Sequence, residues 1–534
     1  MHRSLRPGFF LSLLLPAALC AQNVQWVTTA DNNWTLNPVM PVNVLCAGDP
    51  DHVYEARLDE HRYLFGSDVY GSYIMARRGL DGTELWNVPV GDSVIVTAIA
   101  SNAEGTVVLG GRYFDHLRIA GGTHLFSPPS HVIEGTFLCS WNAAGELLWV
   151  VDASGEALDD YDVAAIAVDP QGDHWAALST FFGSRLVHLG ADGSFLEERP
   201  LENTKVIGGM SFDPWGGLYV AGAASVPDIG INGTTFPIEE QYAFFVTRMD
   251  ANGTAQWLHA AHDITFQRPS VVADATGHAF LAGPLFDTLS WGDLHFEAPD
   301  WNTTFFLTRL DSMGTFEWGR QPDQNNFAGQ FALAQGRTLG VDGAGHVYVL
   351  GTTNGELDWG NGVVTDVGTN QDQDVTLLSF DTNGDARWEL HGGSDSHDVV
   401  QELSVLPEGI CHFIGTTGST YTLGGLSVDP EEARASVTVR VDGPLSTGLA
   451  LVPAGVAPFM AVPSVFSDGF RLRSDAYPDG AAVHVVATDA LGRRVGTAAR
   501  TGELLGMDWA AGTYQVQVKV GEAFQVLRVI KQHH

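Results

Sequence analysis

The chain has 534 residues, of which 45% are hydrophobic, so it can bury a large core and exceeds the length of one ordinary domain. Its 27 Lys and Arg residues stand against 63 Asp and Glu residues, a formal net charge of -36. This charge makes nucleic acid and anionic membrane surfaces poor partners, because binding to phosphate requires a field of the opposite sign.

The first 21 residues have the layout of a secretory signal peptide. Arg3 and Arg6 precede an apolar run at residues 9–15, and we expect cleavage between Ala21 and Gln22. The apolar run is shorter than the roughly 20 residues that a membrane-spanning helix needs. No later stretch is long and apolar enough either, so we expect no transmembrane segment.

Residues 22–443 repeat a unit of two β-hairpins about seven times, a period that predicts a repeat fold. In the first hairpin an alternating apolar run ends at Asp, and a Gly three residues later permits the turn, as in residues 341–351. In the second hairpin Asp and Gly are followed by Trp, as in residues 244–257. The earliest copy of the first hairpin, residues 58–66, has His61 in place of the Gly. Two hairpins make one four-stranded sheet.

The two ends of the repeat region complement each other. Residues 24–29 resemble a Trp strand without its unit, whereas residues 436–443 form a strand and turn that no Trp strand follows. Joining them removes the two unpaired edges of an open array. We therefore predict an all-β fold, a closed seven-bladed β-propeller whose last blade is completed by residues 24–29, with Trp26 beside Val439.

Three cysteines remain after cleavage of the leader. Cys46 lies on the connection from the closing strand into the first blade, and Cys411 lies in the last blade. In a closed ring these two could form a disulfide, which requires about 4.4–6.8 Å between the Cα atoms. The alternative is that both remain buried thiols.

The links between the second and third strands of the units are long, whereas the other links within a unit are tight turns. These links and the connections between blades emerge on one face, and we expect the functional surface there. The long links are residues 112–135, 223–241, 284–302, 352–372 and 416–432.

Four tryptophans fall in loops rather than at the hairpin position: Trp34, Trp291, Trp301 and Trp359. Exposed aromatic rings there would stack on sugars or peptides, which makes them candidates for ligand contact. The alternative is that they pack the loops onto the blades, since Trp is often largely buried.

Acidic residues in one long link are candidates for calcium. Asp366, Asp372 and Asp374 offer oxygen ligands, although their spacing is not that of an EF-hand and Asp is common in turns. No nucleophile elbow, phosphate-binding loop or paired Cys motif is present. The sequence therefore predicts no catalytic residue and no cofactor other than this calcium.

The region after the repeats changes in composition. Residues 444–463 are rich in Gly, Pro, Ala and Leu without charge, which is typical of a linker. Residues 464–534 contain alternating runs at 482–487, 512–520 and 524–530, which predict a small antiparallel β-sandwich.

Both regions resemble known families. The repeats are similar to the SBBP-type β-propeller repeat, which reads Asp, small, Gly, aromatic, Gly and then Asp, Asn, Gly, Trp; this likeness covers residues 24–443 and implies no single activity. The tail resembles the type A C-terminal sorting domain of the type IX secretion system (T9SS) of the Bacteroidota. The resemblance lies in residues 463–470, 489–495, 511–518 and 526–531, although the Pro-Asn-Pro of that family is Pro463-Ser464-Val465 here.

The second resemblance implies export through the periplasm, recognition by the type IX secretion machinery, and removal of the tail with release or attachment at the outer cell surface. We expect a secreted or cell-surface binding or structural protein without catalytic activity, whose ligand is an unknown protein or glycan. The alternatives are a calcium-dependent adhesin or polysaccharide-binding module, and a propeller enzyme, a hydrolase or lyase, with its site on the long-loop face. An enzyme would gather perturbed acids, bases or His on that face or in the axial channel, and a binding module an aromatic patch.

Overall fold

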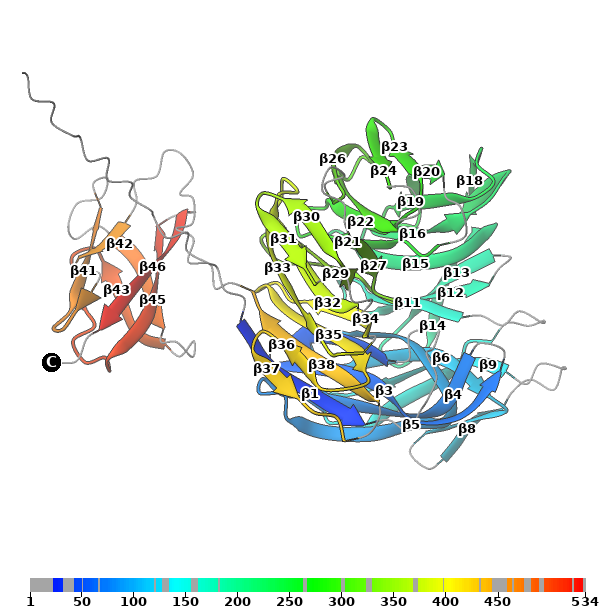
Figure 1. Ribbon diagram of the computed structural model, residues 1–534, viewed down its shortest axis with the longest axis horizontal. Helices are drawn as coiled ribbons and strands as arrows, with labels where there is room; N and C mark the ends of the chain where they lie inside the picture. The colour runs from blue at the N-terminus through cyan, green and yellow to red at the C-terminus, as the bar shows by residue number, and fades with distance from the viewer. Residues whose placement is uncertain are drawn as a thin grey trace, which may run out of the picture. The chain divides into compact units, whose positions relative to one another are not determined.

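The computed structural model describes residues 23–31, 43–49, 51–65, 68–119, 122–126, 134–154, 162–180, 183–262, 267–298, 303–322, 329–367, 373–396, 398–431, 434–443, 459–462, 465–474, 482–488, 494–520 and 523–531. Contacts between residues separate Gln22–Gly443 from Pro444–His534. The fold is all-β, as predicted, and we call the first part the propeller and the second the tail unit (Figure 1). None of the described residues forms a helix with the length and apolarity to cross a membrane.

The strands of the propeller group by pairing into the repeat units that the sequence predicts, here numbered in chain order. Unit 1 contains β2 (Asn43–Asp49), β3 (His52–Phe65), β4 (Asp68–Arg78) and the start of β5 (Glu84–Ser101); unit 2 contains the end of β5, β6 (Val107–Phe114), β9 (Glu134–Trp141) and β10 (Leu147–Asp152). Unit 3 contains β11 (Asp162–Val168), β12 (His174–Thr180), β13 (Gly183–Leu189) and β14 (Phe195–Glu202).

The remaining units follow the same antiparallel order. Unit 4 contains β15 (Thr204–Phe212), β16 (Leu218–Ala224), β19 (Ala243–Met249) and β20 (Ala255–His262); unit 5 contains β21 (Ser270–Ala273), β22 (Ala279–Leu285), β25 (Thr304–Leu310) and β26 (Phe316–Arg320). Unit 6 contains β27 (Gln330–Leu333), β28 (Leu339–Val341), β29 (Val347–Asn354), β32 (Asp374–Phe380) and β33 (Ala386–Gly393); unit 7 contains β34 (Val399–Val405), β35 (Ile410–Thr417), β38 (Ala435–Asp442) and β1 (Asn23–Asp31).

The first strands of the units contact one another in a closed series around the axis. The series runs β2, β5, β11, β15, β21, β28, β34 and back to β2. Units 1 and 2 form a single seven-stranded sheet, because β5 pairs with β4 in its first half and with β6 in its second. The sheets themselves are therefore not separated into seven, and the blade number stays a prediction.

The ring is closed by the N-terminal strand, as predicted. Strand β1 pairs antiparallel with β38, and Val27, not Trp26, lies opposite Val439. The expected register is wrong by one residue because a bulge between Val24 and Trp26 places Trp26 opposite Arg440.

Polar contacts also join the first unit to the last. The amide of Asn43 donates to Oε1 of Gln401 over 2.7 Å, and the hydroxyl of Thr438 donates to Oε2 of Glu55 over 2.6 Å. Both contacts are buried, so they hold the closure without competition from water.

The predicted first turn of unit 1 at residues 58–61 is wrong. Strand β3 runs straight through Leu58 and His61, and its partner β4 continues opposite both residues. The turn lies earlier, where Asp49 of β2 pairs with His52 of β3. With no Gly at residue 61, this stretch extends the pairing with β4 instead of turning.

In every unit but unit 3, the fourth strand carries a Trp, which in most units packs against the turn of the next unit. The ring of Trp26 lies against Gly82, whose φ is 80°; a Cβ atom at this position would lie 2.8 Å from the ring, so there is no room for a side chain. The indole Nε1 of Trp26 donates to the carbonyl of Leu80 over 2.9 Å. The same bond to a second-hairpin turn recurs from Trp86 to Ala143, Trp149 to Ala191, Trp257 to Ser312 and Trp318 to Thr382.

The Trp of unit 6 breaks this series. Trp388 is buried, and its Nε1 has no hydrogen-bond partner among the described residues. The reason lies in the closure: the last strand of unit 7 is β1, so the described part of the chain has no turn between the third and fourth strands of this unit that could offer a carbonyl to Trp388.

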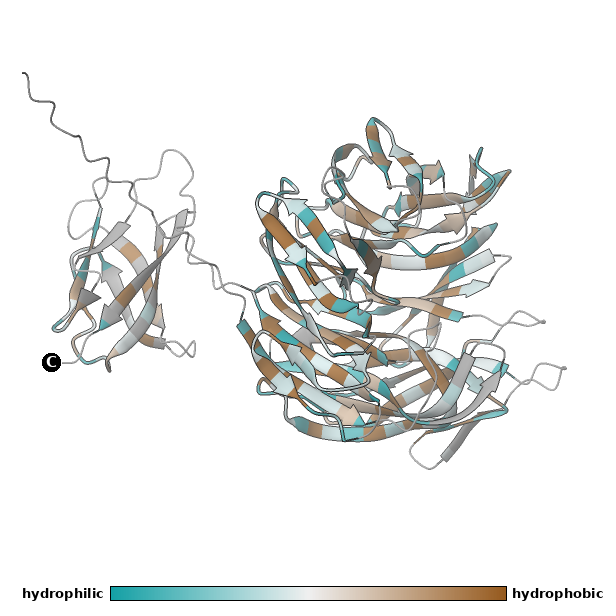
Figure 2. Ribbon diagram, in the orientation of Figure 1, coloured by the Kyte–Doolittle hydropathy of each residue, from teal (hydrophilic) through white to brown (hydrophobic). Residues whose placement is uncertain are grey.

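Hydrophobic side chains fill the space between neighbouring units. In one such cluster Trp175 and Leu186 of unit 3 pack with Val220 and Phe245 of unit 4. Figure 2 shows hydrophobic residues recurring along the strands of the propeller. Each unit is therefore stabilised mainly by its neighbours.

Each of the long links contains a short hairpin, which the sequence analysis does not predict. Buried residues alternate along the first strand of four of these hairpins, as with Leu289 and Trp291, whose strand contacts β20 of the preceding unit; in the fifth, residues 229–231 are all buried. The hairpins are β7 (His116–Ile119) with β8 (Gly122–Phe126), β17 (Asp228–Ile231) with β18 (Thr234–Pro237), β23 (Thr288–Trp291) with β24 (Leu294–Glu297), β30 (Glu356–Gly360) with β31 (Val363–Asp366), and β36 (Tyr421–Leu423) with β37 (Leu426–Val428).

Of the two alternatives for Cys46 and Cys411, the structure has the buried thiols and not the disulfide. Both are free, buried thiols, as is Cys139. Cys46 packs in the core of units 1 and 2 and donates to the hydroxyl of Ser101 over 3.3 Å, whereas Cys411 packs between units 6 and 7. Burial raises the pKa of Cys46 to about 12, so this thiol stays protonated.

The tail unit forms two sheets around one core. One sheet has the order β39 (Phe459–Val462), β41 (Phe470–Ser474), β44 (Leu504–Leu505) and the other β40 (Val465–Phe466), β46 (Ala523–Lys531), β45 (Gly512–Val520), β42 (Ala482–Thr488), β43 (Arg494–Arg500). Phe466, Phe470 and Tyr514 lie in the core. The expected sandwich is present, but it is not wholly antiparallel, because β40 pairs with β46 in parallel.

Candidate functional site: the axial cavity

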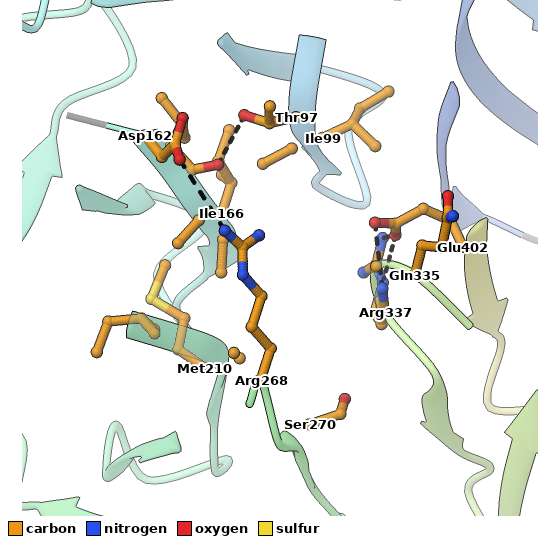
Figure 3. A pocket seen from close by; sticks show the side chains of 18 of the residues that line it. Thr97, Ile99, Asp162, Ile166, Met210, Arg268, Ser270, Gln335, Arg337 and Glu402 are labelled. Atoms are coloured by element: carbon orange, nitrogen blue, oxygen red, sulfur yellow. Dashed lines mark hydrogen bonds and ion pairs between the residues drawn. The ribbon is translucent and has the colours of Figure 1, made fainter. Parts of the chain in front are cut away.

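The first strands of the units enclose a cavity of about 80 Å³ at the axis of the propeller. This is room for on the order of five water molecules. Its walls come from units 2 to 7, and its charged residues are Asp162, Arg268, Arg337 and Glu402. Figure 3 shows them as two ion pairs on opposite sides of the open space.

On one side of the cavity, Arg268 precedes β21 in the chain, and its side chain points toward Asp162 of β11. Its Nη2 lies 4.0 Å from Oδ2 of Asp162, while Oδ1 of the same carboxylate lies 2.9 Å from Nε of Arg112. Asp162 is therefore shared between two arginines, and Arg268 has the looser contact. The side chain of Arg268 is 37% exposed, so its guanidinium keeps donors for a group in the cavity.

On the other side, Arg337 lies between β27 and β28 and contacts Glu402 of β34. Its Nη2 is 3.2 Å from Oε2 of Glu402 and donates to the carbonyl of Leu45 over 2.8 Å. The side chain of Glu402 is 7% exposed and that of Arg337 is 36% exposed. Burial raises the pKa of Glu402 above its ordinary value, although the charge of Arg337 opposes this.

The cavity presents two guanidinium groups, each beside a carboxylate. Glu402 is 7% exposed behind Arg337, whereas Asp162, which contacts Arg112 and Arg268, is 28% exposed. Planar guanidinium groups match the geometry of carboxylate and phosphate oxygens. The arrangement can bind a small anion.

The tryptophans predicted as ligand contacts do not form a contact surface. Trp291 is 1% exposed and Trp359 is 5% exposed, so this prediction is wrong for both. Trp291 packs against Phe306 and Phe316, and Nε1 of Trp359 donates to the hydroxyl of Thr365 over 2.7 Å. Their hairpins turn the rings into the interface between units. Trp34 and Trp301 lie outside the described residues, as do Ala21 and Gln22.

The calcium candidates are partly outside the described chain. Asp366 is exposed at the end of β31 and Asp374 is half-buried at the start of β32, whereas Asp372 is not described. The charge of Asp374 also affects two residues where unit 6 connects to unit 7. Glu389 is the main cause of the raised pKa of His391, and Asp374 adds to it. Burial is the main cause that raises the pKa of Asp398 to about 6, and Asp374 again adds to it.

Sequence reasoning missed the axial arginines. Arg268 and Arg337 carry no motif, and their partners Asp162 and Glu402 are distant along the chain. The available signal was only their place at the first strands of their units, which a closed ring brings to one axis. Such residues become a set only once the ring is known.

No protein-family model matches the chain, and no curated protein does so either. Similar solved structures include hydrazine synthase from Kuenenia stuttgartiensis (10% identity, TM-score 0.43, 75% of this chain and 99% of that chain). Virginiamycin B lyase from Staphylococcus aureus is 9% identical (TM-score 0.34, 64% and 94% covered), and puromycin hydrolase is 15% identical (TM-score 0.34, 70% and 58% covered). These likenesses concern the fold alone, and the chain has a β-propeller fold.

The comparisons correct one expectation. The sequence led us to expect a protein without catalytic activity, but the similar structures are mostly named as enzymes. A fold that hosts synthases, lyases and hydrolases gives no ground for excluding catalysis. Their activities are not transferred to this chain, because the identities are close to 10%.

Proposed function

We propose that this protein is an exported β-propeller that binds a small anionic ligand, a carboxylate or a phosphate, in its axial cavity. The observation that carries the proposal is the pair of half-exposed guanidinium groups of Arg268 and Arg337, each backed by a carboxylate. In a chain with a net charge of -36, most of the surface repels anions, so a cavity that presents two guanidinium groups is distinctive.

Binding of acetate, citrate, glucuronate and inorganic phosphate to the purified chain, measured by calorimetry, tests this proposal. We expect at least one of these anions to bind and Arg268→Met to weaken that binding at least tenfold, because a charged donor is lost from the cavity. Arg320→Met is the matched control, since Arg320 lies in β26 and contacts the turn of unit 6. Equal binding by both variants, or binding of none of the four anions, would overturn the proposal.

The second part of the proposal concerns delivery. Residues 1–21 act as a cleaved leader, and residues 464–534 act as a T9SS sorting domain of the Bacteroidota type that brings the propeller through the periplasm to the outer surface. The sequence resemblance supports this, and so does the separation of the contacts after Gly443, since a removable tail needs a core of its own. Its partner is the type IX secretion machinery.

Deleting residues 464–534 is expected to leave the protein in the periplasm of its host, with a mature N-terminus at Gln22. Cell fractionation and N-terminal sequencing measure both. As the matched control, residues 464–534 fused to a periplasmic reporter should bring the reporter to the surface. Unchanged surface display of the deleted form would defeat the sorting proposal and leave the binding proposal untouched.

A further inference from the structure

Units 4 and 5 share an arrangement at the end where their first hairpins turn. In both, the aromatic residue of the second strand lies under an arginine of the third strand, and this arginine contacts the Asp of the turn. In unit 4 the guanidinium of Arg248 lies 5.6 Å from the ring of Tyr219 and 2.7 Å from Oδ2 of Asp213. In unit 5 Arg309 has the same relation to Phe280 and Asp274.

Unit 3 departs from this arrangement at the third strand. His188 stands opposite Trp175, where Arg248 stands opposite Tyr219 in unit 4. The imidazole of His188 stacks on the indole of Trp175, with ring centroids 4.3 Å apart and an angle of 12°. The change is chemically specific, because an arginine has no lone pair to offer a metal ion and a neutral imidazole has one.

Unit 3 also departs at the fourth strand, which has no Trp. Arg199 of β14 takes its place: its Nη2 donates to the carbonyl of Ala251 over 3.3 Å, and its guanidinium lies 4.3 Å from the ring of Trp175. A linear side chain fills less space than an indole. Beside Arg199 lies a cavity of about 190 Å³, which is also lined by Trp175, His188 and Trp215.

Two carboxylates meet His188 at the edge of this cavity. Nε2 of His188 lies 3.7 Å from Oδ2 of Asp169 and 3.5 Å from Oδ2 of Asp173. All three ligand atoms lie within 4.8 Å of one another. Ligand atoms about 2.0–2.2 Å from a tetrahedral zinc ion are roughly 3.4 Å apart, so the three groups need only small movements to share one ion.

The neighbourhood holds the three groups in this direction. Oδ1 of Asp169 accepts the backbone N–H groups of Gln171 and Asp173, and its Oδ2 accepts Nε1 of Trp175 over 3.2 Å. Nε2 of His188 is shielded from solvent and makes no hydrogen bond within the described residues. Hydrogen bonds that fix a carboxylate, as those to Asp169 do, are typical of metal ligands.

We propose that Asp169, Asp173 and His188 bind a divalent transition metal ion of the zinc type. The nitrogen ligand favours zinc over calcium or magnesium, which prefer oxygen ligands alone. Three protein ligands leave a fourth position, and it faces the 190 Å³ cavity beside Phe212 and Trp215. A water molecule or a small ligand with an oxygen donor completes the site there, at a place separate from the axial cavity.

Titration of the metal-free full chain with Zn²⁺ by calorimetry, and with Co²⁺ by visible absorption, tests the proposal. We expect one ion per chain and a Co²⁺ spectrum of tetrahedral intensity. His188→Ala and Asp173→Asn are each expected to weaken binding at least tenfold. Asp173→Asn keeps the side-chain size, so it also reports on ligand loss if His188→Ala disturbs the stacking on Trp175.

His278→Ala is the matched control. His278 also lies next to a turn Asp, Asp274. In unit 5, however, the position of His188 is occupied by Arg309, which cannot bind a metal ion, so the substitution should not change metal binding. The proposal is overturned if the unaltered chain binds neither ion in a 1:1 ratio. It is also overturned if folded His188→Ala and Asp173→Asn bind both ions as tightly as the His278→Ala control.

Discussion

Replacing Trp26 with alanine is expected to lower the free energy of unfolding of the propeller by about 3–5 kcal/mol. Trp26 is buried, lies against Gly82 of unit 1 and donates to Leu80 from the strand that completes unit 7. The substitution leaves a void at the seam where the ring closes and removes the bond across it. Unfolding in guanidinium, followed by circular dichroism, measures the effect.

A pair of phenylalanine variants separates the hydrogen bond from the packing. Trp26→Phe and Trp388→Phe remove the same atoms from buried positions, but only Trp26 has an acceptor for its Nε1. We expect Trp26→Phe to cost about 1 kcal/mol more than Trp388→Phe, the usual net value of one hydrogen bond. Equal costs would show that the bond to Leu80 does not stabilise the seam.

Replacing Glu55 with glutamine is expected to destabilise the propeller by about 3–5 kcal/mol. Two buried arginines lose their buried counter-charge and keep only Glu84, whose side chain is 28% exposed. Oε1 of Glu55 lies 2.6 Å from Nη1 of Arg57 and 2.7 Å from Nη2 of Arg78. Its other oxygen accepts the hydroxyl of Thr438 from unit 7. The same unfolding measurement at neutral pH gives the magnitude.

The pH dependence of this effect has a defined sign. Burial would raise the pKa of Glu55, but Arg78 and Arg57 outweigh it and hold the pKa below its ordinary value. A lowered folded pKa gives stability that is present above the unfolded value of about 4.3 and is lost as the pH falls through the folded pKa. The Glu55→Gln variant should therefore lose less stability than the unaltered chain on acidification.

The control for Glu55 is an ion pair near the surface. Arg185 and Glu198 lie 3.1 Å apart, with side chains 23% and 37% exposed. Glu198→Gln should cost no more than about 1 kcal/mol, since water and salt screen such pairs. If Glu55→Gln costs no more than this, the buried cluster does not contribute to closure as we expect.

The ring could be predicted from sequence because its signals are local. The Asp and Gly of each turn are required by the backbone conformation of that turn alone. The strand at residues 24–29 has no partner in its own region, and residues 436–443 lack a following strand, so the two can be paired from the sequence. The one-residue error at Trp26 and the misplaced turn at residues 58–61 came from a bulge and from a hairpin extended beyond the usual length. Both depend on pairing that a repeat pattern does not specify.

The sequence of the long links contains a signal for their hairpins. Leu289 and Trp291, and likewise Leu357 and Trp359, alternate with polar residues before a Gly, which is the pattern of a half-buried strand. Their place in loops, away from the hairpin position, favours exposure instead. The alternation would have predicted that these rings are buried.

The two sites were less accessible to prediction for different reasons. The axial arginines come from units far apart in sequence, so they are joined only by the fold. Asp169, Asp173 and His188 lie close in sequence, and their signal was a difference from the other units, the loss of the Trp after Gly193. Comparing each unit with the other units shows where the repeat pattern is lost, and functional residues are expected at such positions.

The seam between β1 and β38 sets the order in which the molecule can be completed. Thr28 and Thr438 are neighbours across this seam but 410 positions apart in the chain, so the first strand to be synthesised waits for nearly all of the others. Until then, the outer edge of β38 is open to any other extended chain. Synthesis of nearly the whole propeller therefore precedes the last folding step, and a chain that ends before β38 cannot take that step.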